Sequence, residues 1–377
     1  MRETTLLTGG TGMVGRGLAA LLLQRTSSDV LLLIHRNGQH LDKSDLVRRI
    51  LGLPADEEYV SRLTILHGDI TQTNLGLTTA EQEDLSRRLT HVLHAAASTR
   101  FDLPLEQARR INVGGSENVA RLALRSPGLQ QFGLLSTVYV SGTRTGRVEE
   151  AAPGQGTAFI NSYEQSKCEA EIALWRLVPG LPLAVYRLST VVGDSRNGHV
   201  THFTAPHQAL RIMHLGLGAL VPGKPECPVD FISSDYSAST VFELFWENFA
   251  CHQTYHITHG DGSLSLQEAV EENYRGLARA DEEWARRRYP MPAIVTPAAF
   301  DLFMETALTA RNLAMTSTLR ALDRFARQFV HPKEFDRANV LAALPAYESR
   351  LPDVHDYYPK MIEYCVRTRW GRGQPLE

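Results

Sequence analysis

The sequence predicts an α/β fold, in which a doubly wound parallel sheet is joined to a smaller, mainly helical C-terminal domain. Over the first two-thirds of the chain, short apolar runs alternate with segments of helical periodicity. The runs are too uniformly apolar for strands with one face in water, so helices must cover both faces of the sheet. The last third loses this alternation and has a mainly helical pattern.

The expected strands are spaced so that a helix fits between most neighbours, as parallel pairing requires. The strands are predicted at 4–9, 30–34, 63–69, 91–97, 132–138 and 183–192, with a late strand at 254–262. Helices are predicted at 13–25, 104–125, 163–177, 265–279 and 297–330, and two shorter helices within 339–371. We assign residues 1–199 and 229–260 to the sheet domain, and residues 200–228 and 261–377 to the helical domain.

Composition excludes several classes of protein. The 377 residues carry a formal net charge of −3 without any long basic block, which argues against a nucleic-acid partner. The cysteines Cys168, Cys227, Cys251 and Cys365 lie too far apart to suggest a zinc site or a disulfide framework. The N-terminus lacks a signal-peptide pattern, and no apolar run is long enough to cross a bilayer. We therefore predict a cytoplasmic protein without an integral membrane segment.

The first strand runs directly into "TGGTGMVG", which places Gly9, Gly12 and Gly15 at the start of the following helix. Gly9 permits a tight turn, Gly12 lets the backbone approach a diphosphate, and Gly15 allows the helix to pack closely on the strand. The start of the helix then offers N–H groups to an anion. This strand–turn–helix context favours a dinucleotide site over a glycine-rich turn without a ligand.

The ends of the next strands refine the cofactor prediction. After the second strand, "IHRNG" presents Arg36 where an acid would bind the ribose of NAD, so we predict NADP(H) with Arg36 on its 2′-phosphate. The alternative is a solvated surface arginine. Asp69 ends the third strand, where its carboxylate could bond the adenine, and Ala95–Ala97 leave room at the end of the fourth strand or simply pack tightly there.

"NSYEQSKCEAE" places Tyr163 and Lys167 four residues apart on one face of a predicted helix. Alone, such a pair is common on half-exposed helices. Here it follows Ser136 and Thr137, which end the fifth strand at the edge where open α/β sheets bind ligands. Reduction of a carbonyl needs a proton donor, and we expect the Lys167 ammonium to lower the pKa of Tyr163 while Thr137 holds the substrate oxygen.

Taken in order, these motifs resemble the extended short-chain dehydrogenase/reductase superfamily, which has the Rossmann fold. "TGGTGMVG", "GDIT", "HAAA", "INVGGSENV", "LSTVYVSG" and "NSYEQSK" match its motifs from residue 5 to about 195. The resemblance implies catalytic roles for Thr137, Tyr163 and Lys167, and a substrate-binding role for the helical domain. The expected cofactor contacts are Gly9, Thr11, Gly12, Met13, Val14, Gly15, Arg36, Asp69, Ile70, Ala95, Ala96, Ala97, Asn112, Lys167, Thr190 and Val191.

Within that superfamily, residues 94–119 resemble fatty acyl-CoA reductases and terminal thioester reductases, in the pattern "AAxxxFDxPL…NVxG". The resemblance implies an NADPH-dependent reductase that converts an acyl thioester to an aldehyde, and in some members onward to the alcohol. Adenylation and carrier patterns are not found in the sequence. We therefore expect the acyl group to arrive in trans, as an acyl-CoA or on an acyl or peptidyl carrier protein.

Two other functions are compatible with the scaffold. A nucleotide-sugar epimerase or dehydratase would favour an acid after the second strand and more basic residues in 195–235 than Arg196, Arg211 and Lys224. A cofactor-sensing scaffold protein would not need the complete set of catalytic residues. The segment 199–214 also contains His199, His202, His207 and His214, which we interpret as pocket or surface residues and not as a metal site, because no acid or cysteine lies among them.

Overall fold

The structure is a computed structural model that describes residues 2–35, 42–154, 156–178, 180–309, 323 and 325–372. Its centre is a seven-stranded sheet in the order β12-β7-β5-β4-β1-β2-β3, in which all neighbours pair in parallel. The strands are β1 (Thr4–Thr8), β2 (Asp29–His35), β3 (Leu63–Gly68), β4 (His91–His94), β5 (Gln131–Thr137), β7 (Leu183–Leu188) and β12 (Thr254–Ile257). The strand order reverses between β1 and β4, which creates a crevice at their carboxyl ends.

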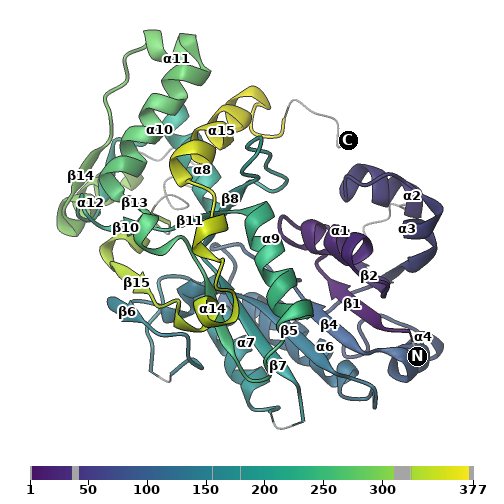
Figure 1. Ribbon diagram of the computed structural model, residues 1–377. Coiled ribbons are helices and arrows are strands. Elements are labelled where there is room, and N and C mark those ends of the chain that lie inside the picture. The colour runs from purple at the N-terminus through teal and green to yellow at the C-terminus, as the bar shows by residue number, and fades with distance from the viewer. Residues whose placement is uncertain are drawn as a thin grey trace.

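Helices cover both faces of the sheet, as the apolar strands require (Figure 1). Neighbouring residues of β1 point to opposite faces: Leu7 belongs to the core under α1 (Gly15–Arg25) and α9 (Ser234–Phe242), and Leu6 to the core on the other face. The second face is covered by α4 (Thr79–Arg88), α6 (Gly115–Ala123) and α7 (Ser162–Trp175). The predicted doubly wound Rossmann fold is confirmed.

The run 183–192 was expected to form one strand, and that prediction is wrong. The chain leaves the large sheet at Ser189, whose N–H donates to the Ile257 carbonyl at 3.1 Å. It continues as β8 (Thr190–Gly193), which pairs with β11 (Phe231–Ser233) in a separate two-stranded sheet. Apolar periodicity does not reveal where one pairing partner is exchanged for another, because both parts of the run are buried.

The helical part lies beyond the carboxyl ends of the strands, where Figure 1 shows α8, α10 and α15 gathered together. Its apolar core joins α8 (Ala205–His214), α10 (Leu266–Ala280), α11 (Glu282–Arg286) and α15 (Val354–Arg367) to β8 and β11. The predicted helix at 297–330 begins as α12 (Pro297–Thr309) and ends as the 3-10 turn Arg327–Val330, with undescribed residues between them. None of the helices in the described ranges has the length and apolar content of a membrane span.

Smaller elements complete the chain. β5 runs directly into the 3-10 turn Val138–Ser141. Earlier in the chain, α5 (Leu105–Arg109) continues through a π turn, Arg110–Gly114, into α6. The others are α2 (Lys43–Asp45), the π turn Leu46–Ile50, α3 (Glu57–Arg62), β6 (Gly146–Val148), β9 (Leu220–Pro222), β10 (Pro228–Val229), the π turn Glu243–Glu247, the 3-10 turn Gly260–Gly262, β13 (Leu264–Ser265), β14 (Ala293–Val295), β15 (Lys333–Phe335), α14 (Ala338–Ala343) and the 3-10 turn Glu348–Arg350.

The C-terminal segment also returns to the sheet. β15 pairs with β6, and Val340, Leu344 and Tyr347 lie in the same core as the helices α1 and α9. The Tyr347 hydroxyl donates to the Thr258 carbonyl at 2.6 Å, next to the end of β12. The two-domain division at residues 200–228 and 261–377 stays a prediction.

Candidate active site

The glycine-rich turn between β1 and α1 is packed as tightly as its sequence suggests. Gly9 has φ +72°, and a Cβ on it would lie 2.6 Å from the Ala96 nitrogen. A Cβ on Gly15 would lie 2.0 Å from the Gly9 carbonyl oxygen. Any side chain at either position would push the turn away from β4 or from α1. Glycine at both positions therefore lets the turn pack directly against the end of β4 and the start of α1.

The start of α1 suits an anion. No side chain caps this helix, whose flanking residue is Val14. Its first N–H groups therefore carry the partial positive charge that favours a phosphate. The turn, the uncapped helix and the cavity described next all fit a nicotinamide dinucleotide.

A cavity of about 680 Å³ lies along the carboxyl ends of the strands. It is lined by both halves of the predicted site, the cofactor residues and the catalytic residues. The predicted residues on its wall are Gly9, Thr11, Gly12, Met13, Val14, Gly15, Asp69, Ile70, Ala95, Ala96, Ala97, Thr137, Tyr163, Lys167, Thr190 and Val191. Motifs more than 180 residues apart in the sequence therefore meet around one space, although their individual roles stay predictions.

The other two predicted cofactor residues are Arg36 and Asn112, and only Asn112 belongs to the described part of the chain. Arg36 lies outside the described residues, and its neighbour His35 lines the cavity beside Asp69, with 3.9 Å between the His35 Nε2 and an Asp69 oxygen. Asn112 is buried behind the cavity, where it accepts from the Ser98 N–H at 2.8 Å and donates to the Ser166 hydroxyl at 2.9 Å. Asn112 therefore ties the loop after β4 to α7, the helix that carries Tyr163.

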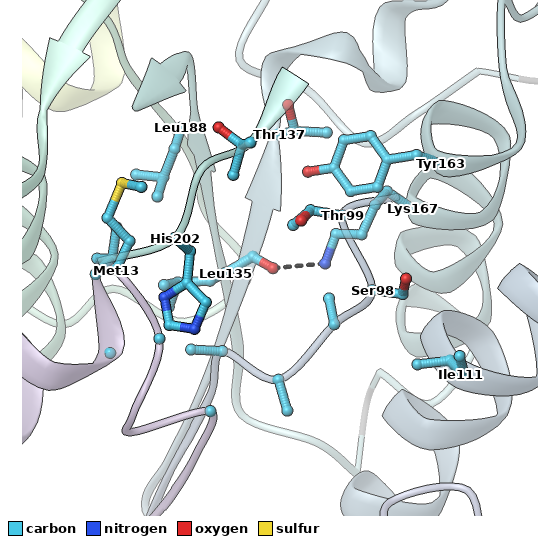
Figure 2. Close-up of a pocket in the computed structure, with 18 of the residues that line it drawn as sticks. Met13, Ser98, Thr99, Ile111, Leu135, Thr137, Tyr163, Lys167, Leu188 and His202 are labelled. Atoms are coloured by element: carbon cyan, nitrogen blue, oxygen red, sulfur yellow. Dashed lines mark hydrogen bonds between the residues drawn. The ribbon is translucent and has the colours of Figure 1, made fainter. Parts of the chain in front are cut away.

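Tyr163 and Lys167 extend from α7 toward the cavity, and Met13 and His202 lie on its opposite side (Figure 2). The Tyr163 ring stacks on Phe101, with 5.5 Å between ring centroids. The Lys167 ammonium donates to the Leu135 carbonyl at 2.7 Å, the contact drawn in Figure 2. Thr137 comes from the end of β5, so neighbouring elements present all three side chains to the same space.

Burial is the largest influence on the pKa values of Tyr163 and Lys167. Burial raises the pKa of Tyr163 to about 12, and a hydrogen bond with Thr137 lowers it only in part. Burial also lowers the pKa of Lys167, to about 8, and the charge of Glu171 opposes that shift. Burial therefore acts on both groups, and the role of Lys167 toward Tyr163 stays a prediction.

A buried network of hydrogen bonds and an ion pair lies one helical turn beyond Lys167. Glu171 lies one helical turn after Lys167, accepts from the Ser136 hydroxyl at 2.5 Å and forms an ion pair with Arg187 at 2.7 Å. Glu171 and Arg187 are almost completely buried. The two predicted hydroxyls on β5 therefore have different partners. Thr137 lines the cavity and forms a hydrogen bond with Tyr163. Ser136 also lines the cavity, but its hydroxyl donates to Glu171 in this network.

The four histidines of 199–214 lie in different environments. His202 lines the cavity, His199 packs on Tyr364, and His214 bonds to Asp281 at 2.9 Å. His207 is buried, accepts from the Thr204 N–H at 3.0 Å and donates through Nε2 to the Val192 carbonyl at 2.7 Å. Within the described part of the chain, no three His, Cys, Asp or Glu side chains are grouped as a metal site.

The structure adds wall residues that the sequence analysis missed. They come from the loop after β4, the 3-10 turn after β5, the start of α8 and the segment before β15. The main ones are Ser98, Thr99, Phe101, Tyr139, Thr204, Ala205, Pro206, Phe325 and Gln328. No motif identifies Phe325 or Gln328, since both fall within a stretch predicted only as helix.

Comparison with known proteins assigns the family. Residues 7–241 match the family model described as "Male sterility protein". The chain belongs to this family. The match spans the glycine-rich turn, the Tyr163–Lys167 helix and strands β2 to β7 of the sheet, and it supports an NAD(P)-binding oxidoreductase of the short-chain dehydrogenase/reductase type.

The curated relatives are longer proteins, and the chain spans about half or less of their length. It is 27% identical over 323 residues to the carboxylic acid reductase of Segniliparus rugosus, covering 76% of this chain and 27% of that protein. It is 26% identical over 276 residues to the fatty acyl-CoA reductase wat of Drosophila melanogaster, covering 64% and 53%. The terminal R domain of the myxalamid biosynthetic pathway has the same fold, with a TM-score of 0.78, 23% identity and coverage of 99% and 93%.

Proposed function

We propose that this chain is an NADPH-dependent reductase that converts an acyl thioester to an aldehyde. The observation that carries the proposal is the single cavity that joins the glycine-rich turn to Thr137, Tyr163 and Lys167. The names of the relatives, a fatty acyl-CoA reductase among them, point to the thioester as substrate. The preference for NADPH rests on Arg36 in the sequence.

Tyr163, Thr137 and Lys167 each have a separate role in the proposed reaction. A bound nicotinamide would supply the hydride. The Tyr163 phenol, whose pKa of about 12 keeps it protonated at neutral pH, would give its proton to the carbonyl oxygen as negative charge develops there. Thr137 would hold that oxygen, and Lys167 would stabilise the phenolate that remains. Loss of the thiol from the resulting hemithioacetal then gives the aldehyde.

The wall of the cavity argues for a thioester over a nucleotide sugar. On the side away from the glycine turn, the lining includes Phe101, Pro206 and Phe325. Of the described lysines and arginines, Arg110 and Lys167 line the cavity, which leaves few cations for a second diphosphate. Delivery as an acyl-CoA or on a carrier protein in trans both remain part of the proposal.

The test is a substrate panel of acyl-CoAs, carrier-bound acyl groups and free aldehydes, with NADPH oxidation followed and products identified by mass spectrometry. We expect oxidation with at least one thioester and an aldehyde or alcohol as product. Turnover of aldehydes alone would contradict the thioester assignment. Tightly bound NAD⁺ in the ultraviolet spectrum of the purified protein would instead favour the epimerase or dehydratase.

A further inference from the structure

Gln328 reaches the candidate active site from a distant part of the chain. It lies in the 3-10 turn Arg327–Val330 and lines the cavity together with Phe325. Only 7% of its surface is exposed. An amide side chain so deeply buried normally has hydrogen-bond partners at both its nitrogen and its oxygen.

The nitrogen end of this amide has a partner. The Gln328 Nε2 donates to a carboxylate oxygen of Glu164, the residue after Tyr163. The same oxygen accepts from the Asn161 Nδ2 at 2.7 Å, and the other carboxylate oxygen accepts from the Ile160 N–H at 3.3 Å. Glu164 is fully buried and is surrounded by N–H donors, so it holds the Gln328 amide with its NH₂ group toward α7.

The orientation of this cluster is fixed independently by the start of α7. The Asn161 Oδ1 accepts from the Glu164 N–H at 3.0 Å and caps the helix. The nitrogen of Asn161 is therefore the end that faces the Glu164 carboxylate. This arrangement places the Glu164 side chain, and through it Gln328, in a defined position beside Tyr163.

The oxygen of the Gln328 amide, Oε1, is buried and does not form a hydrogen bond within the described part of the chain. Gln328 lines the cavity, so a substrate bound there would lie beside its amide group. Nearby hydroxyls are engaged elsewhere: Tyr139 bonds to Thr190 at 2.8 Å and Thr204 bonds to His207 at 3.1 Å. Buried amide oxygens usually have a hydrogen-bond partner, so this one is available to a ligand.

We propose that Gln328 recognises the substrate, by accepting a hydrogen bond at Oε1 from an N–H or O–H group near the reacting thioester. This inference rests on the proposed function. The donor has two possible sources with the same chemistry: a hydroxyl or amide on the acyl group, or an amide of the pantetheine arm. The Glu164 carboxylate acts as a positioning residue, because it determines which end of the amide faces the cavity.

The test compares the wild-type protein with Gln328→Met, which keeps the length of the side chain and removes the acceptor. Three thioesters of equal acyl length separate the sources: an unsubstituted acyl-CoA, its 3-hydroxy derivative, and an acyl ester of a simple alkyl thiol without amides. Gln165→Met is the matched control, since Gln165 follows Glu164 on α7, does not line the cavity and bonds to Glu169 at 3.0 Å.

We expect Gln328→Met to raise KM about tenfold for substrates that carry the donor and to leave the alkyl thioester and the Kd for NADPH unchanged. An effect on the 3-hydroxy substrate alone assigns the donor to the acyl group, and an equal effect on both CoA esters assigns it to the pantetheine arm. An equal rise in KM with all three substrates, or no rise with any of them, would overturn the proposal.

A binding measurement separates this proposal from the proposed function. If the wild-type protein reduces none of the three thioesters, the shift in melting temperature that each produces in the NADPH-loaded protein is compared between the wild type and Gln328→Met. A smaller shift in the variant for the donor-carrying thioesters alone still supports recognition by Gln328. Identical shifts in both proteins, or no shift in either, would overturn it.

Discussion

The two ends of the cavity are built in different ways. The glycine-turn end is made from short, continuous motifs at the carboxyl ends of neighbouring strands, such as Gly9–Gly15 after β1 and Ala95–Ala97 after β4. The opposite end is assembled from segments far apart in the chain, which include Phe101, the start of α8 and the turn that carries Gln328. A doubly wound sheet places its cofactor by topology, whereas the substrate wall depends on how the later segments pack.

Tyr163 lies where these two ends meet, so its substitution should have the largest effect. We expect Tyr163→Phe to lower kcat about 10³-fold, the usual size of a lost general acid, with the Kd for NADPH nearly unchanged. Single-turnover oxidation of NADPH would measure this. Tyr139→Phe is the matched control on the same wall: it loses the 2.8 Å contact with Thr190 and should cost less than about tenfold. Similar losses in both variants would contradict the proton-donor assignment.

The glycine-turn end can be tested by its choice of cofactor. Arg36→Ala should raise KM for NADPH by about 10- to 100-fold, because a charge-assisted contact with the 2′-phosphate is lost. KM for NADH should change little, since NADH lacks that phosphate. Steady-state kinetics with both cofactors would measure the difference. Equal effects on the two would refute the phosphate contact.

The far end can be tested through the pH dependence of stability. His207 joins the start of α8 to β8 as a neutral imidazole, and burial lowers its pKa from 6.5 to about 4. As the pH falls through this window, the unfolded chain binds a proton that the folded chain rejects. The stabilisation from His207 is therefore complete above pH 6.5 and is lost toward pH 4, by on the order of 3 kcal/mol.

His207→Gln should reduce this loss, whatever its effect on stability at neutral pH. Denaturant unfolding at several pH values between 4 and 7 would measure it, with His355→Gln as the control at an exposed position of α15. If the free energy of unfolding depends on pH equally in His207→Gln and the wild type, His207 takes up its proton as readily in the folded protein as in the unfolded chain, which would contradict the lowered pKa.

The sequence was sufficient for the sheet and for most of the glycine-turn end because those features are local. Apolar runs with helices between them predict parallel strands, and the glycine spacing predicts a turn that has little room for any side chain at Gly9 or Gly15. It failed where a run of similar residues changes partner, as at Ser189 between β7 and β8. It also did not predict that burial raises the pKa of Tyr163, because burial cannot be read from spacing along the chain.

What the sequence alone determined is therefore the family, the parallel sheet and the residues that end its strands. Only the tertiary structure decided that His202 and not His207 faces the cavity, and that Gln328 reaches the space beside Tyr163. The physical reason is the range of the interactions. Strand ends and glycine turns are set by neighbours along the chain, whereas a buried hydrogen bond between Glu164 and Gln328 exists only after two distant segments have packed together.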